Sequence, residues 1–271
     1  DYEWKQAKDL DNNDILMTPR RAIDGKITSL PGSEDVVVPL LNEYCAWFVG
    51  FMQSKKQYEN KKDSHYFSYK FSKQEYCFAE RVKYMLNAFT DDASDAIIEL
   101  KEYQNYYIVS CACEEIYNYM NKYIMGMVDI PAYISSGLYE IRISFIAGIV
   151  DGNKNCNTLK KNRVPLNICT HINKTFVKHL QTVCYSCGFE TRMKYDLSLN
   201  SYQLNAMTNH AINSILDASI VLKYDIIKSY EDMPVQNQNG FPYKILNKKR
   251  KYSTISSKLG LAKNKNVSMN I

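Results

Sequence analysis

Two short apolar runs stand out along the chain, residues 44–56 (YCAWFVGFMQSKK) and 144–155 (SFIAGIVDGNKN). Their pattern predicts two helices that are built to be buried. Each run carries a glycine, Gly50 in the first and Gly148 in the second, and Ala147 lies beside the latter. Because a glycine on a helix face lets a second helix backbone approach closely, we expect the two helices to pack through these small residues.

The segments that follow each run repeat in type and order. After the first run, period-2 and period-3.6 patterns predict a strand, a helix, a strand and a helix in residues 65–72, 73–89, 103–111 and 113–125. After the second run, they predict a strand at 164–171, a helix at 173–189 capped by Asn173, strands at 190–197 and 201–208, and a helix at 210–222. The repeat predicts an α+β protein with internal pseudo-symmetry.

The composition is that of a globular chain of 271 residues, 45% of them hydrophobic, which is enough for one large core or two smaller ones. No uncharged apolar run approaches the roughly 18 residues of a membrane span, so we expect no membrane partner. The sequence begins with Asp1 and shows no signal peptide, which indicates a fragment or a processed chain.

The positive charge is concentrated at the carboxyl end. The formal net charge is +5, and residues 239–271 contain eight Lys or Arg and no Asp or Glu. The cluster NKKRKYS (247–253) has two readings, a nuclear localisation or phosphate-contacting segment and a merely solvated terminus.

The eight cysteines show no disulfide-like framework, which favours reduced thiols and a nuclear or cytoplasmic protein. Cys184 and Cys187 have zinc-ligand spacing, but no second pair follows at a finger-like distance, so we expect them in the core. The four histidines form no pair at metal-binding spacing.

The run FIAGIVDGNK (145–154) resembles the second signature of the LAGLIDADG homing endonucleases. Residues 129–145 resemble the approach to that signature in the vacuolar-ATPase intein and mating-type-switching group, and residues 2–10 and 200–225 resemble segments of the same group. The resemblance implies a pseudo-two-fold LAGLIDADG fold, with two αββαββα-like halves forming a saddle that binds double-stranded DNA. It also implies a monomer with an internal pseudo-dimer.

In that family each signature helix ends in an acidic residue, and the two carboxylates share Mg²⁺ ions that activate water for strand cleavage. The alignment puts Lys55 and Asn153 at these acidic positions. Asp151 is a weaker alternative, because it lies two residues earlier, about 200° round the helix. A like charge 4 Å away contributes about 4 kcal/mol at an effective dielectric of about 20, so Lys55 would repel a metal ion. We therefore expect impaired or absent cleavage and no cofactor; Mg²⁺ would be required only if the protein is an active endonuclease, which is the alternative.

The resemblance and the charge pattern predict DNA contacts at basic positions in strands and termini. These are Arg20, Arg21, Lys70, Lys73, Arg192, Lys194, Lys248, Lys249, Arg250 and Lys251. A more distant alternative is a protein-binding or RNA-binding role.

The expected domains are a remnant of a splicing-domain edge (1–30), a first half (35–140), a second half (141–235) and a basic tail (236–271). Splicing itself is not expected, because Asp1 replaces the initial Cys or Ser and no His precedes Asn270.

Overall fold

The computed structural model describes residues 15–16, 24–58, 65–91, 95–125, 129–153, 166–218 and 243–244. The chain forms two compact units, one of residues Arg21–Gln238 and one that combines Asp1–Arg20 with Asn239–Ile271. The second unit is described only at a short antiparallel pair, β1 (Ile15–Leu16) with β8 (Tyr243–Lys244). The expected remnant at 1–30 and the basic tail at 236–271 therefore lie largely outside the described residues.

The first half of the larger unit begins with helix α1. Its elements are α1 (Glu43–Ser54), β2 (Tyr66–Ser72), the 3₁₀ turn η2 (Lys73–Glu75), α2 (Tyr76–Asn87), β3 (Ile97–Glu102), β4 (Tyr106–Ala112), α3 (Glu114–Met120) and the π-helical turn η3 (Asn121–Met125). The strand β3 was not predicted from the sequence.

The second half repeats the same order. After the short α4 (Ala132–Ser135) come α5 (Tyr139–Gly152), β5 (Leu166–His171), α6 (Lys174–Ser186), β6 (Thr191–Asp196), β7 (Ser201–Ala206) and α7 (Asn209–Ala218). As predicted, Asn173 caps α6, because its side-chain oxygen accepts from the amides of Thr175 and Phe176.

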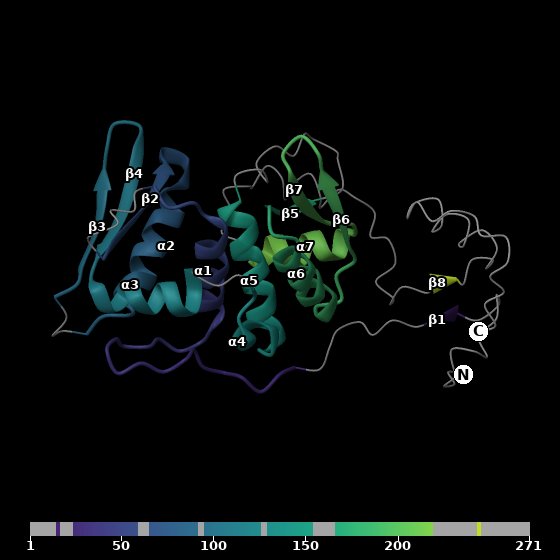
Figure 1. The fold of residues 1–271 in the computed structure, drawn as a ribbon, viewed down its shortest axis with the longest axis horizontal. Coiled ribbons are helices and arrows are strands. Elements are labelled where there is room, and N and C mark those ends of the chain that lie inside the picture. Colours follow the sequence, from purple (N-terminus) through teal and green to yellow (C-terminus); the bar gives the residue numbers. More distant parts are fainter. Residues whose placement is uncertain are drawn as a thin grey trace. The chain divides into compact units, whose positions relative to one another are not determined.

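Each half contains one antiparallel three-stranded sheet, and the strand orders β2-β4-β3 and β5-β7-β6 correspond. In Figure 1 the two sheets lie on opposite sides of the α1 and α5 pair. This confirms the predicted α+β fold with two pseudo-symmetric halves. Within the described residues each half reads α-β-α-β-β-α, one strand fewer than the αββαββα-like pattern that the resemblance implied, and the segments 59–64 and 154–165 lie outside the described residues.

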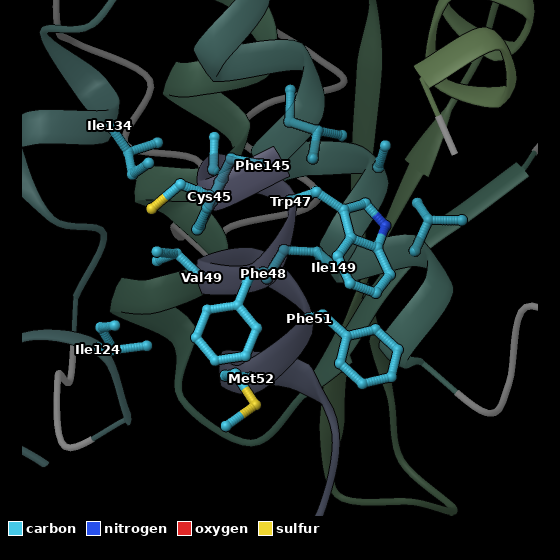
Figure 2. Close-up of a cluster of buried hydrophobic side chains, with 14 of the residues drawn as sticks. Cys45, Trp47, Phe48, Val49, Phe51, Met52, Ile124, Ile134, Phe145 and Ile149 are labelled. Atoms are coloured by element: carbon cyan, nitrogen blue, oxygen red, sulfur yellow. The ribbon is translucent and has the colours of Figure 1, made fainter. Parts of the chain in front are cut away.

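The helices α1 and α5 form the centre of the larger unit. Residues 45–52 of α1 and 141–152 of α5 are all buried. Figure 2 shows apolar side chains projecting from α1 on several sides, with Phe145 and Ile149 of α5 among their neighbours. Helices that are apolar all round are stable only when they are covered all round, which explains why the most apolar runs became the central pair.

Glycines allow these two helices to touch backbone to backbone. A Cβ built on Gly50 would lie 2.1 Å from the carbonyl oxygen of Phe145, and one on Gly148 would lie 2.0 Å from that of Trp47. Such distances leave no room for a side chain. Ala147, also expected at this interface, is fully buried in α5.

The described cysteines carry free thiols, and Cys184 and Cys187 are buried in the core. Burial raises the pKa of the Cys45 thiol to about 12, which keeps this thiol protonated and unreactive. Among the described residues, no helix combines the length and the apolar character that crossing a membrane would require.

Candidate nucleic-acid interface

The helices α1 and α5 end side by side. Each is followed by a residue with extended backbone, Lys55 (φ −80°, ψ 122°) after α1 and Asn153 (φ −85°, ψ 112°) after α5. A Cβ built on Gly152 would lie 1.9 Å from the hydroxyl oxygen of Ser54 and 3.2 Å from the backbone nitrogen of Lys55. The two positions that the resemblance assigns to acidic residues therefore follow helix ends in direct contact.

The side chain of Lys55 turns into the first half instead of toward solvent. Its side chain is 2% exposed, and its Nζ lies 3.1 Å from Oε1 of Glu75. The same ammonium lies 4.6 Å from the ring centroid of Phe71, within the range of a cation–π contact. From the sequence we expected a charge that would repel a metal ion. The structure places this charge next to a carboxylate that neutralises it.

Glu75 is held in place from two directions. Its Oε2 accepts from the backbone amide of Ser72 at 2.8 Å, while its Oε1 faces Lys55. Burial by itself raises the pKa of Glu75, but the Ser72 amide and the Lys55 ammonium outweigh it and hold this pKa below its usual value. Glu75 is therefore ionised at neutral pH.

Asp151, the alternative acidic residue, lies between the two helices and is buried. Its Oδ2 accepts from Nε1 of Trp47 at 2.9 Å. Trp47 is in turn covered by the guanidinium of Arg81, 4.4 Å from its ring centroid. The carboxylate thus ties α5 to α1 within the core, one residue before the last residue of α5.

Asn153 faces the second half, where it begins a chain of side-chain amides. Its Nδ2 donates to Oδ1 of Asn167 at 3.2 Å and to the carbonyl oxygen of Ile168 at 3.5 Å. Nδ2 of Asn167 donates to Oδ1 of Asn205 at 3.4 Å. The end of α5 is therefore connected by hydrogen bonds to the middle strand of the second sheet.

The second sheet has one apolar and one polar face. Leu204 and Ala206 of β7 are fully buried on the side that packs against α6, so Gln203 and Asn205 between them face the other way. The strand register places one row of residues beside each of these two amides. One row consists of Asn167, Asn205 and Arg192, and the other of Thr170, Gln203 and Lys194. We call these two rows the outer face of the second sheet.

A β-bulge keeps the β5 residues on this face. The register shifts between Asn167 and Cys169, and Ile168 and Cys169 are both buried although they are adjacent. The extra residue returns Thr170 to the same side as Asn167.

The first sheet exposes lysines on its outer face. Lys70 of β2 and Lys101 of β3 both pair with Ile108 of β4, so the three side chains form one row. The Nζ of Lys70 lies 3.8 Å from the ring centroid of Tyr106, and that of Lys101 lies 2.6 Å from Oε2 of Glu99.

The other residues predicted to contact DNA lie in different parts of the chain. Arg192 and Lys194 are exposed on the outer face of the second sheet. Lys73 lies beyond the end of β2 in η2 and pairs with Glu102. Arg20, Arg21, Lys248, Lys249, Arg250 and Lys251 lie outside the described residues.

Sequence reasoning missed Lys101, Asn167, Gln203 and Asn205. Lys101 could have been found from the alternation in residues 97–102, had a strand been predicted there. The others needed the strand register, which one sequence does not supply.

Among the described residues, no group of three or more His, Cys, Asp or Glu side chains converges on a point that could hold a metal ion.

No protein-family model matches the sequence. No curated protein matches it either. Among solved structures, the chain is similar to I-DmoI in complex with DNA and Mn, with 13% identity, a TM-score of 0.47, and coverage of 66% of this chain and 96% of that chain. A mesophilic variant of the homing endonuclease I-DmoI gives 14% identity, a TM-score of 0.48, and coverage of 66% and 97%. Full-length DUF199/WhiA from Thermatoga maritima gives 12% identity, a TM-score of 0.42, and coverage of 84% and 68%.

Proposed function

We propose that this protein binds double-stranded DNA through the outer faces of its two sheets and does not cut it by a two-carboxylate mechanism. We further propose that it derives from an intein-type homing endonuclease of the LAGLIDADG group, which rests on the sequence resemblance. In this proposal a single chain binds as a monomer, since its two halves supply both arms of the saddle, and it works in the nucleus or cytoplasm, where its thiols stay reduced.

The observation that carries the proposal is the chemistry of the outer face of the second sheet. Arg192 and Lys194 provide exposed cations, and Asn167, Asn205 and Gln203 provide amides between them. Cations of this kind hold phosphates, and amides and guanidinium groups in the major groove hydrogen-bond with base edges. The first sheet adds the cations of Lys70 and Lys101 on its own outer face.

The helix ends support the second part of the proposal. A Mg²⁺ ion between two phosphates needs anionic oxygen ligands. The positions after α1 and α5 supply an ammonium group, already paired with Glu75, and a carboxamide, already bonded to Asn167. These two side chains cannot neutralise a divalent ion.

An active Mg²⁺-dependent endonuclease is the alternative function. One observation favours it: Glu75 brings a carboxylate to the end of α1. Its use as a metal ligand would require Lys55 to move away.

Fluorescence anisotropy with duplex DNA at several salt concentrations tests the binding. Each phosphate contact contributes about 0.9 to the slope of log affinity against log salt. Lys70→Ala and Lys194→Ala should each weaken binding to all sequences and lower this slope by about 1. Lys178→Ala is the matched control, because this exposed lysine lies on α6, on the opposite side of the second sheet. Equal effects at all three positions would contradict the proposed face.

Incubation of the full chain with a plasmid library and Mg²⁺ or Mn²⁺ tests the absence of cleavage. We expect binding without linear products. Reproducible double-strand cuts would establish the endonuclease instead, and Glu75→Gln, once circular dichroism shows that it is folded, would report whether Glu75 contributes to them.

A further inference from the structure

The amide chain that starts at Asn153 has a fixed direction, because one of its partners can act only as an acceptor. The carbonyl oxygen of Ile168 cannot donate, so the Asn153 atom that faces it must be the amide nitrogen. The same nitrogen faces Oδ1 of Asn167 at 3.2 Å. A single backbone carbonyl therefore sets the orientation of the first two amides.

The donor-to-acceptor direction of these hydrogen bonds continues to β7, the middle strand of the sheet. The hydroxyl of Thr170 also lies 3.4 Å from Oδ1 of Asn167, to which it can donate. With this oxygen turned toward Asn153, Nδ2 of Asn167 donates to Oδ1 of Asn205. The amide of Asn205 then has its oxygen on the β5 side and its NH₂ group on the other side.

The neighbour on that other side is Arg192, which pairs with Asn205 in the register of β6 and β7. A guanidinium group has five N–H donors and no acceptor. The NH₂ of Asn205 and the guanidinium of Arg192 then supply donors on this side of the row, and neither group carries an acceptor.

In the neighbouring row, which contains Gln203, the amide is turned the other way, with its oxygen outward instead of its NH₂ group. Nε2 of Gln203 donates to Oδ2 of Asp196 at 2.9 Å, and a carboxylate can only accept. The oxygen of the Gln203 amide is therefore the atom left to face outward, and Lys194 is the neighbour of Gln203 in the register of β6 and β7. The two rows thus present different hydrogen-bonding patterns two residues apart on the same strand.

We propose that the row of Asn167, Asn205 and Arg192 is a guanine-reading site, and that Asn153 is the positioning residue that fixes its polarity. In the major groove, guanine presents two adjacent acceptors, O6 and N7. Adenine places a donor beside its N7, and cytosine presents a donor, so each would meet the donors of this row with one unfavourable contact. This inference rests on the proposed binding of duplex DNA and adds a base preference to it.

Position 153, which the resemblance assigns to a catalytic acid, would then contribute to the base preference. A carboxylate at position 153 could not donate to the carbonyl of Ile168 or to Oδ1 of Asn167. The orientation of the whole amide chain would lose its anchor, so the asparagine is the residue type that this arrangement requires.

Selection of bound duplexes from a random library, followed by affinity measurements on single-base variants, tests the inference with the full chain. The wild type should select guanine at one or more positions, and replacing that guanine should weaken binding about 5- to 150-fold. Asn205→Asp should abolish this preference, because it replaces a donor by an acceptor. Asn153→Ala should reduce the preference for guanine much more than it reduces the affinity for non-specific duplex.

Lys194→Gln is the charge-matched control. It lowers the charge of the same outer face by one, in the neighbouring row, and leaves Asn205 and Arg192 unchanged. Both variants should lower overall affinity by similar factors, and only Asn205→Asp should change the preference at the guanine position.

The outcomes separate this inference from the proposed function. Tight, salt-dependent binding with no guanine position that responds to Asn205→Asp would overturn the inference and leave DNA binding intact. Identical base preferences in Asn205→Asp and Lys194→Gln would also overturn it. Absence of any duplex binding would overturn both.

Discussion

The ammonium of Lys55 lies 3.1 Å from a carboxylate oxygen of Glu75, at the end of the helix where the sequence resemblance places a metal-binding acid. Lys55 is nearly fully buried, and Glu75 is 20% exposed in its side chain. An ion pair at this depth has lost most of its hydration, so each partner depends on the other. The residue that follows α1 therefore belongs to a buried ion pair within the first half.

Removing one partner of this ion pair should destabilise the fold. We expect Glu75→Gln to cost about 1–3 kcal/mol, since it leaves the buried ammonium without its counter-charge. Urea denaturation followed by circular dichroism measures the loss. The double variant Lys55→Met with Glu75→Gln should recover most of it, because no unpaired charge remains. If the single and double variants are equally unstable, the pairing is not what stabilises this site.

The same pair predicts how stability depends on pH. The folded-state pKa of Glu75 is below its unfolded value, so its contribution to stability is complete above the unfolded pKa and is lost as the pH falls through the folded one. The difference in unfolding free energy between the wild type and Glu75→Gln should therefore be constant near neutrality and shrink as the pH drops below about 4.5. Denaturation curves at a series of pH values check this, and a difference that grows in acid would contradict the assigned direction.

The contact between α1 and α5 predicts a severe effect of one added methyl group. In Gly148→Ala the new Cβ would lie 2.0 Å from the carbonyl oxygen of Trp47, which can be relieved only by moving the helices apart. We expect a loss of more than about 2 kcal/mol in unfolding free energy. Gly32→Ala is the control, because a Cβ there meets nothing within 4 Å. Comparable losses in the two variants would show that the close approach of the helices is not the cause.

Restoring acidic residues at both helix ends should create affinity for divalent cations. In Lys55→Asp with Asn153→Asp, two carboxylates would follow helix ends that touch at Gly152 and Ser54, with Glu75 close by. Carboxylate oxygens are the ligands that Mg²⁺ and Ca²⁺ prefer. Isothermal titration with Ca²⁺ measures the gain over the wild type.

Asp151→Asn in the same double variant is the control for that titration. Asp151 is buried against Trp47, so its removal should leave the cation affinity of the double variant in place. Loss of the affinity would show that Asp151, and not the two introduced residues, holds the ion.

Much of the fold follows from local sequence patterns. The two apolar runs predicted the central helices, the repeated order of elements predicted the two halves, and Asn173 predicted the start of α6. These features depend on interactions within a few residues, namely helical periodicity and capping, so one sequence contains the information. No strand was predicted at β3, whose Glu99, Lys101 and Glu102 belong to residue types that are depleted in strands.

The sequence by itself also determined that Lys55 and Asn153 follow the two apolar runs, at the positions where the resemblance predicted acids. Only the tertiary structure decided what these residues do: it brought Glu75 to Lys55, and it brought Asn167 and Asn205 into line with Asn153. Asn153 and Asn167 are 14 residues apart in the sequence, Asn167 and Asn205 are 38 apart, and Lys55 and Glu75 are 20 apart. The physical reason is that a charge or an amide takes its role from whichever groups the packing places beside it, and strand register and helix contact set those neighbours across long stretches of chain.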